Sequence, residues 1–250
     1  MKTILLEEMS WPQIKAAMEA GYKTVLIAAG SIEQHGPHLP EGTDSMLGYS
    51  FGEGVARELG NTLVAPTIRP GLSEHHMGFP GSLTLRVSTF MAVMEDYVDC
   101  YVRHGFENII IFPTHGGNFK SVDDFIAEAP KKFPNTNVIN GFDSEIMSKL
   151  SELSAKESEF PPNVGGAHAG ASETSYMLLF YPHLVDMSVA EEGFVGNFAD
   201  VRDEMFKNGM RAVTKNGILG DARPANVEHG KRAAERMFKV CAEIIRKRLV

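Results

Sequence analysis

Short apolar runs alternate with amphipathic stretches along this chain. Four runs have the length of β-strands and cover residues 24–29, 62–65, 108–112 and 137–139. Their apolar residues are consecutive instead of alternate, which is typical of strands covered on both faces. The pattern therefore predicts an α/β fold in which a mostly parallel sheet lies between helical layers.

The amphipathic stretches predict the helices. Residues 89–104 carry one apolar stripe and are followed by Gly105, a residue that favours a helix end, and residues 45–59 are a second candidate. From Glu228 onward apolar residues recur at helical spacing, and basic residues gather near the end, where the helix dipole favours cations. Further helices are expected over residues 200–207 and in the segment that ends at Phe180.

Nothing in the sequence divides it into separate domains. We find no internal repeat or low-complexity tract, and the polar stretch over residues 151–162 is interpreted as a surface excursion. Residues 1–250 are therefore expected to form a single domain.

Composition excludes several classes of protein. Lys and Arg total 24 against 32 Asp and Glu, and the net charge of -8 would repel a nucleic acid. No segment reaches the roughly 18 apolar residues of a membrane helix, and no signal peptide is recognised. Cys100 and Cys241 both lie in helix-patterned segments, so we expect no disulfide and a reducing compartment, by default the cytoplasm.

Histidines and carboxylates gather in loops that follow the expected strands. Glu33 and His35 stand two residues apart after the first strand, so both project to one side of an extended segment, and a Gly/Pro-rich turn can return Asp44 toward them. Two carboxylates and an imidazole suit a divalent ion such as zinc or manganese. Six of the nine histidines lie in loops punctuated by Gly and Pro: His35, His38, His75, His76, His115 and His168.

Two more loops reach the same edge of the sheet. Residues 113–118 follow the third strand and contribute His115, while Gly116 and Gly117 leave the backbone free to approach an oxyanion. Residues 165–175 contribute His168 and Glu173 before a helix. Three carboxylates, Glu33, Asp44 and Glu173, together with one hydroxide balance two divalent ions, which could activate that bridging hydroxide for hydrolysis.

These loops resemble the creatininase family of metal-dependent amidohydrolases. The resemblance lies in Gly-Ser-Ile-Glu-Gln-His-Gly-Pro-His-Leu-Pro-Glu-Gly-Thr-Asp at residues 30–44, in His-Gly-Gly-Asn at 115–118, and in His-Ala-Gly-Ala-Ser-Glu-Thr-Ser at 168–175. It implies a three-layer α/β/α domain, commonly a homohexamer, with two zinc, manganese or iron ions that serve hydrolysis of C–N bonds in small cyclic or linear amides.

The resemblance also implies roles for individual residues. Glu33, Asp44 and His115 resemble the ligands of one ion, and His35, the shared Asp44 and Glu173 those of the other. His168 resembles the proton shuttle, which would protonate the departing nitrogen after the bridging hydroxide attacks the carbonyl. Substrate contacts are expected from Ser73, Glu74, His75, Gly116, Gly117 and Asn118, whereas His38 and His76 are interpreted as structural.

Departures from creatininase change the expected substrate. Creatininase has a ligand Glu where this chain has Gly117, and a Trp-Asp pair where this chain has Val164 and Gly165. Creatinine is therefore disfavoured, and the His-Gly-Gly-Asn form resembles relatives that act on formamides, modified peptides or keto-inositol rings. Two alternatives stay open: hydrolysis of a C–C bond in a keto-inositol by the same metal site, and a binding or assembly protein without catalysis.

Overall fold

The computed structural model describes residues 2–157 and 160–249. Within these residues the four strands form one sheet in the order β2-β1-β3-β4, and every neighbouring pair is parallel. Leu26 of β1 is in register with Val64 of β2 and with Ile110 of β3. The strands span Thr24–Ala29 (β1), Thr62–Val64 (β2), Asn108–Pro113 (β3) and Asn137–Asn140 (β4).

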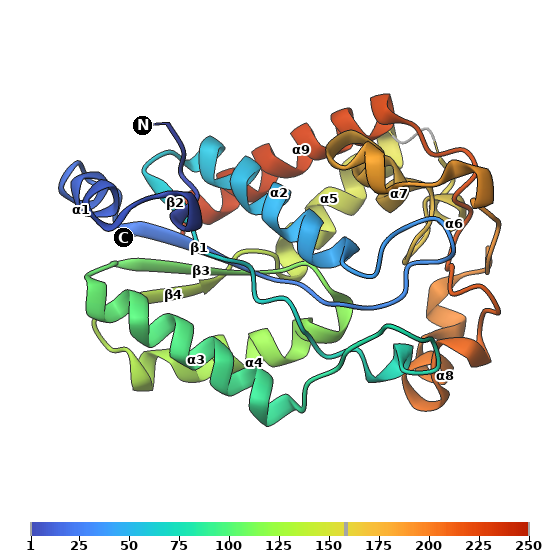
Figure 1. The fold of residues 1–250 in the computed structure, drawn as a ribbon, viewed down its shortest axis with the longest axis horizontal. Coiled ribbons are helices and arrows are strands. Elements are labelled where there is room, and N and C mark those ends of the chain that lie inside the picture. The colour runs from blue at the N-terminus through green and yellow to red at the C-terminus, as the bar shows by residue number, and fades with distance from the viewer. Residues whose placement is uncertain (1, 158–159, 250) are drawn as a thin grey trace.

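Helices cover both faces of the sheet, so the fold has three layers (Figure 1). On one face lie α3 and α4, and on the other lie α2, α5, α7 and α9. The helices span Trp11–Glu19 (α1), Thr43–Leu59 (α2), Val87–His104 (α3), Phe119–Lys132 (α4), Ser144–Glu157 (α5), Pro162–Gly165 (α6), Ala171–Phe180 (α7), Phe198–Asn208 (α8) and Val227–Arg246 (α9). Short 3-10 turns lie at Leu6–Glu8, Glu74–His76, Gly116–Asn118, Pro182–Leu184, Met187–Val189 and Met210–Ala212.

Alternate residues of the strands enter two separate apolar cores. Val25 and Ile27 of β1 belong to the core under α3 and α4, whereas Leu26 belongs to the core under α2 and α9. All three side chains are buried. The continuous apolar runs of the sequence therefore reflect strands buried on both faces, which confirms the expected α/β fold with a parallel sheet.

The long helices agree with the amphipathic pattern, and α3 ends at Gly105, which adopts φ 89° in the left-handed region. The expected surface excursion over residues 151–162 is partly helical: residues 151–157 belong to α5, with several exposed side chains, and residues 158–159 lie outside the described residues. Leu150 and Leu153 of this helix pack against the core under α2 and α9. The apolar positions of α5 begin before residue 151. The polar stretch that starts at residue 151 therefore shows no helical pattern when it is taken alone.

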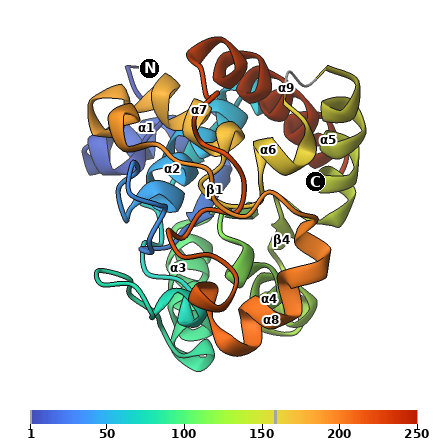
Figure 2. The ribbon, with the colours of Figure 1, turned by 90° about the vertical axis from the view of Figure 1, so that its right-hand side faces the viewer.

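The carboxyl ends of the strands face the viewer in Figure 2, where several long loops lie over them. This edge of a parallel sheet is where ligand sites form in open α/β folds. Among the described residues, no helix is long and apolar enough to cross a membrane.

Candidate active site

The first loop is held against the start of α2 by close backbone packing. A Cβ atom on Gly30 would lie 2.6 Å from the Cα atom of Ser45, so only glycine permits this approach. Ser45 Oγ donates a hydrogen bond of 2.7 Å to the Ser31 carbonyl, which ties the loop to the helix. As a result, Asp44 in the first turn of α2 faces Glu33 and His35.

Asp44 lies between two histidines. Its Oδ1 atom is 3.5 Å from His35 Nε2, and its Oδ2 atom is 3.2 Å from His115 Nδ1. On the far side, His35 Nε2 is 3.6 Å from Glu173 Oε1, and His115 Nε2 is 3.2 Å from Glu33 Oε2. Ligand atoms about 2.0–2.1 Å from one tetrahedral zinc ion lie about 3.3–3.4 Å apart, so these separations are of the size that a shared ion requires.

Several of these atoms are buried without a hydrogen-bond partner in the described part of the chain: Glu33 Oε1, His35 Nε2 and Asp44 Oδ2. Burying unpaired polar atoms is costly unless something else satisfies them. A cation bound between the loops would satisfy all three, because each atom can offer a lone pair. The donor set of carboxylates and imidazoles therefore fits a divalent metal.

Hydrogen bonds of the surrounding loops orient the imidazoles. His35 Nδ1 lies 2.9 Å from the Glu33 carbonyl, to which it can donate, so that Nε2 is left as the acceptor that faces Asp44. His115 Nε2 lies 3.1 Å from the Leu72 carbonyl, so a donated bond there leaves Nδ1 as the acceptor toward Asp44. Once deprotonated in these tautomers, both histidines would present a lone pair to a cation held at Asp44.

The structure groups the candidate ligands differently from the family pattern. Among the described residues, the compact groups that could hold an ion are Glu33-His35-Asp44, His35-His168-Glu173 and Glu33-His76-His168. His115 is in none of them, since one ring nitrogen faces Asp44 and the other faces Glu33. The expected trio of Glu33, Asp44 and His115 is in contact, but it does not converge on one point as closely as Glu33, His35 and Asp44 do.

Glu173 combines a structural contact with a place at the site. Its Oε2 atom accepts a 2.6 Å hydrogen bond from the Ala169 amide, while Oε1 faces His35. No side chain at residue 117 can serve as the metal ligand that creatininase has there. A Cβ atom on Gly117 would lie 2.2 Å from the Leu72 carbonyl oxygen and 2.5 Å from His115 Nε2. A side chain at residue 117 is therefore incompatible with this backbone.

Proton affinities within the site reflect the crowding of opposite charges. Burial opposes protonation of His115, but Glu33 and Asp44 outweigh it and raise the pKa of His115 to about 10. Burial likewise opposes protonation of His35, yet Glu173 and Asp44 hold the pKa of His35 well above its ordinary value. A metal ion that binds these imidazoles must therefore compete with protons.

The carboxylates respond in the opposite sense. Burial alone would raise the pKa of Glu173, but His35 lowers that pKa to about 2. The pKa of Glu33 is likewise held well below its ordinary value, because His115, His76 and His168 together overcome its burial. Both carboxylates are therefore charged at neutral pH and available to a cation.

His168 is held at one nitrogen and open at the other. Its Nε2 atom donates a 2.7 Å hydrogen bond to the Gln34 carbonyl, and Nδ1 lies 3.7 Å from Glu33 Oε1. Burial, followed by the nearby charge of His35, lowers the pKa of His168, so the ring is neutral at pH 7. Nδ1 is thus a free acceptor that faces the carboxylates.

A cavity of about 890 Å³ opens from these residues toward solvent. Glu33, His115 and His168 line it together with residues of α8. The α8 residues Phe198, Arg202, Met205 and Phe206 follow helical spacing, so one face of the helix covers the cavity.

The expected substrate contacts divide into two sets. His75, Gly116 and Gly117 line the cavity. Ser73 is fully buried beneath His115, and Glu74 is exposed outside the cavity.

Asn118 is also fully buried. Its amide donates to the Ala29 and Gly30 carbonyls and accepts from the Leu72 amide. Its side chain therefore ties the turn at residues 115–118 to the first loop and to the loop that follows β2.

Sequence reasoning missed two residues that connect the site. His76 Nε2 lies 3.2 Å from Glu33 Oε1, and its Nδ1 atom accepts from the Gln34 amide at 3.0 Å. Gln34 also donates to the Gly217 carbonyl. In an extended segment the side chain of Gln34 is expected to point away from those of Glu33 and His35, so the spacing gave no reason to include it in the site. Its partner Gly217 is distant in sequence and is brought to it only by the fold.

Comparison with known proteins identifies the family. The model of the family described as "Creatininase: Creatinine amidohydrolase" matches residues 7–245. The chain belongs to the creatininase family. The expected resemblance is therefore confirmed over nearly the whole chain.

Named hydrolases are among the relatives in this family. The chain is 28% identical over 234 residues to the mycofactocin precursor peptide peptidase of Mycolicibacterium smegmatis, covering 89% of this chain and 84% of the relative. It is 25% identical to the creatinine amidohydrolase of Pseudomonas putida, over 98% of this chain and 97% of that one. Identity to the 3-dehydro-scyllo-inosose hydrolase of Thermotoga maritima is 25%, with coverages of 97% and 83%. The chain is thus a metal-dependent hydrolase of this family.

Solved structures support the same fold. A crystal structure of creatinine amidohydrolase superimposes with a TM-score of 0.81 at 24% identity, covering 100% of this chain and 99% of that chain. A manganese form of creatininase gives a TM-score of 0.80 at 24% identity, with 99% of each chain covered. The three-layer creatininase fold is therefore confirmed.

Proposed function

We propose that this chain is a dinuclear metal-dependent amidohydrolase that cleaves the C–N bond of a small cyclic or linear amide. The observation that carries the proposal is the convergence of unpaired buried atoms of Glu33, His35 and Asp44 from loops at the carboxyl edge of the sheet. Burying polar atoms without hydrogen-bond partners is unfavourable, and a binding protein without catalysis would gain nothing from placing such atoms beside an open cavity.

The residues present fit two divalent ions, for which zinc, manganese and iron are the candidates. Glu33, Asp44 and His115 would hold one, and His35, Asp44 and Glu173 the other. Bound there, the ions would supply Lewis-acid polarisation of the carbonyl and a water activated at neutral pH. A homohexameric assembly and a cytoplasmic location are proposed on the family resemblance and the cysteine content.

His168 supplies the proton transfer in this proposal. Its Nε2–H is held by the Gln34 carbonyl, so Nδ1 is the atom that accepts a proton at the cavity. The same atom then delivers that proton to the departing nitrogen, as general acid catalysis requires. Backbone amides of Gly116 and Gly117 lie beside the cavity and suit the carbonyl oxygen as it gains charge.

A second candidate function keeps the site and changes the bond. The relative named 3-dehydro-scyllo-inosose hydrolase supports a keto-inositol as substrate, for which the sequence left open the hydrolysis of a C–C bond beside the ketone. In that reaction His168 would protonate a carbon atom instead of a nitrogen atom.

A substrate screen tests the proposal. The protein loaded with zinc or manganese is assayed against creatinine, formamides, lactams, short peptides and keto-inositols, with Glu33→Gln as the control. We expect turnover of at least one amide, reduced by at least about 100-fold in Glu33→Gln. Turnover of keto-inositols alone would replace the proposal by the second candidate, and amide turnover that survives Glu33→Gln would remove the mechanism.

A further inference from the structure

One compact group that could hold an ion includes the proposed proton shuttle. Glu33, His76 and His168 each place a ligand atom within 4.8 Å of the other two. An ion bound by this group would take the Nδ1 lone pair of His168, which the proposed mechanism needs for proton transfer. The active site therefore requires a feature that keeps a cation out of this group.

The side chain of Gln34 has one orientation that satisfies its surroundings. Its Oε1 atom accepts a 3.0 Å hydrogen bond from the Gly36 amide, while Nε2 lies 3.1 Å from the Gly217 carbonyl and 3.0 Å from His76 Nδ1. Exchanging the oxygen and the nitrogen would place the oxygen against the Gly217 carbonyl and the amino group against the Gly36 amide. The two hydrogens of Gln34 Nε2 are therefore donated to Gly217 and to His76.

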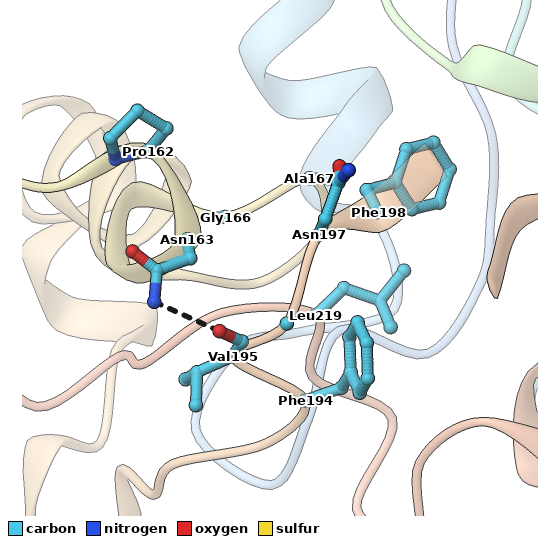
Figure 3. Close-up of a pocket in the computed structure, with 10 residues that line it drawn as sticks. Pro162, Asn163, Gly166, Ala167, Phe194, Val195, Asn197, Phe198 and Leu219 are labelled. Carbon is cyan, nitrogen blue, oxygen red and sulfur yellow. Dashed lines mark hydrogen bonds between the residues drawn. The ribbon is translucent and has the colours of Figure 1, made fainter. Parts of the chain in front are cut away.

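The Gly217 carbonyl is held in place by the segment that follows it. The Leu219 amide donates a 2.9 Å hydrogen bond to the His168 carbonyl. The side chain of Leu219 is buried and lies between the rings of Phe194 and Phe198 (Figure 3). This segment is thus anchored both to the loop of His168 and to an apolar cluster.

Gln34 determines the hydrogen positions on two imidazoles. Because His76 Nδ1 accepts a hydrogen bond, the hydrogen of that ring is on Nε2, which faces Glu33 Oε1 at 3.2 Å. The main-chain carbonyl of Gln34 accepts the hydrogen of His168 Nε2 at 2.7 Å. Gln34 Nε2 also lies 3.1 Å from His168 Nε2, but that ring nitrogen carries a hydrogen and accepts none. His76 thus turns a hydrogen toward the carboxylate where a metal ligand would turn a lone pair.

We infer that Gln34 is a positioning residue that keeps a cation out of the Glu33-His76-His168 group by fixing the hydrogen of His76 on Nε2. With that hydrogen in place, the group offers two lone-pair donors in place of three. An ion could recruit His76 only by moving the hydrogen to Nδ1, which would leave the buried Gln34 amide without an acceptor. The inference rests on the proposed function, which needs His168 Nδ1 to stay free.

Neutron diffraction from crystals of the zinc-loaded protein in heavy water tests the inference in the wild type. We expect deuterium on Nε2 of His76 and none on Nδ1. We also expect no zinc ion at the roughly 2.0–2.1 Å of a Zn–N bond from either nitrogen. Deuterium on Nδ1, or a zinc ion bound to His76, would overturn the inference.

Gln34→Glu reverses the hydrogen bond to His76. The carboxylate accepts a hydrogen from Nδ1, so Nε2 turns its lone pair toward Glu33. We expect this variant to bind one more zinc ion per chain than the wild type at saturating zinc, measured by mass spectrometry. We also expect kcat to fall by at least about 10²-fold, because the added ion occupies His168 Nδ1.

Two controls and a second variant isolate the cause. Gln13→Glu is the matched control, because exposed Gln13 accepts from the Ser10 amide through Oε1 and a carboxylate retains that bond. Gly217→Ala adds no charge, but its Cβ atom would lie 1.7 Å from Gln34 Oε1 and displace that side chain, so an added zinc ion is expected here too. Gly21→Ala carries the same strain of a positive φ with nothing within 4 Å. Both controls are expected to bind as much zinc as the wild type.

The two variants together decide the assignment. An added ion in Gln34→Glu alone would be due to the new negative charge and would overturn the inference, as would wild-type zinc content in both variants. Ion and hydrogen positions are measured without turnover, so the proposed function is tested separately. If they are as expected and no amide is hydrolysed, the inference stands and the proposed function fails. If amides are hydrolysed while His76 carries its hydrogen on Nδ1, the inference alone fails.

Discussion

Asp44→Asn is expected to lower kcat/KM by on the order of 10³-fold or more and to reduce bound metal to less than one ion per chain. The reason is that each Asp44 oxygen faces a different imidazole, Oδ1 toward His35 and Oδ2 toward His115. An amide in place of the carboxylate removes the charge shared by both halves of the site. It also removes one of the carboxylates that raise the pKa of His35 and His115, so both pKa values are expected to fall.

Metal content by mass spectrometry and steady-state hydrolysis measure this effect. Asp99→Asn is a matched control, because Asp99 is an exposed carboxylate on α3 whose contact is a surface ion pair with Arg103. The control should retain both metal and activity. If Asp44→Asn also kept two ions and near-normal kcat/KM, Asp44 would not be the shared ligand.

His168→Ala is expected to lower kcat by about 10² to 10⁴-fold while the protein still binds two ions. The loss should be larger for amides with more basic leaving amines, since these need the proton most. This outcome separates two roles, because His168 is also a member of two compact groups that could hold an ion. A proton shuttle leaves the metal content unchanged, whereas a ligand does not.

Metal analysis and a series of amides with graded leaving groups provide the measurement. His183→Ala, at an exposed histidine in the turn after α7, is the control and should leave kcat unchanged. Loss of one ion in His168→Ala would make His168 a ligand. The proton transfer would then need another residue.

The parts of the fold that follow from burial could be predicted from sequence. β1 and β3 are covered on both faces, so their apolar runs are unbroken, and parallel strands bring their following loops to one edge. The positions of Glu33 after β1 and His115 after β3 follow from this rule, whereas Glu173 lies in α7, which follows no strand. By contrast, residues 151–157 carry few apolar positions of their own, and their place in α5 depends on packing against α9 and the core.

The finer arrangement of the site depends on contacts between distant loops. The Leu72 carbonyl decides which nitrogen His115 turns toward Asp44, and a hydrogen bond from Gln34 fixes the position of His76. Neither contact can be predicted from the spacing of neighbouring residues. Asn118 illustrates the same limit, since its motif suggested a substrate contact and its amide instead joins backbone groups of other loops. Hydrogen-bond partners far apart in sequence determined these roles.

The central claim is that loops from separate parts of the chain form one site for two cations. Calorimetric titration of zinc into the metal-free protein at pH 7, repeated in buffers with different ionisation enthalpies, tests it most directly. The account predicts two zinc ions per chain together with net proton release, because the neighbouring carboxylates raise the pKa of both His35 and His115 before metal binds. Uptake of fewer than two ions at saturation, or binding of two ions without proton release, would contradict it.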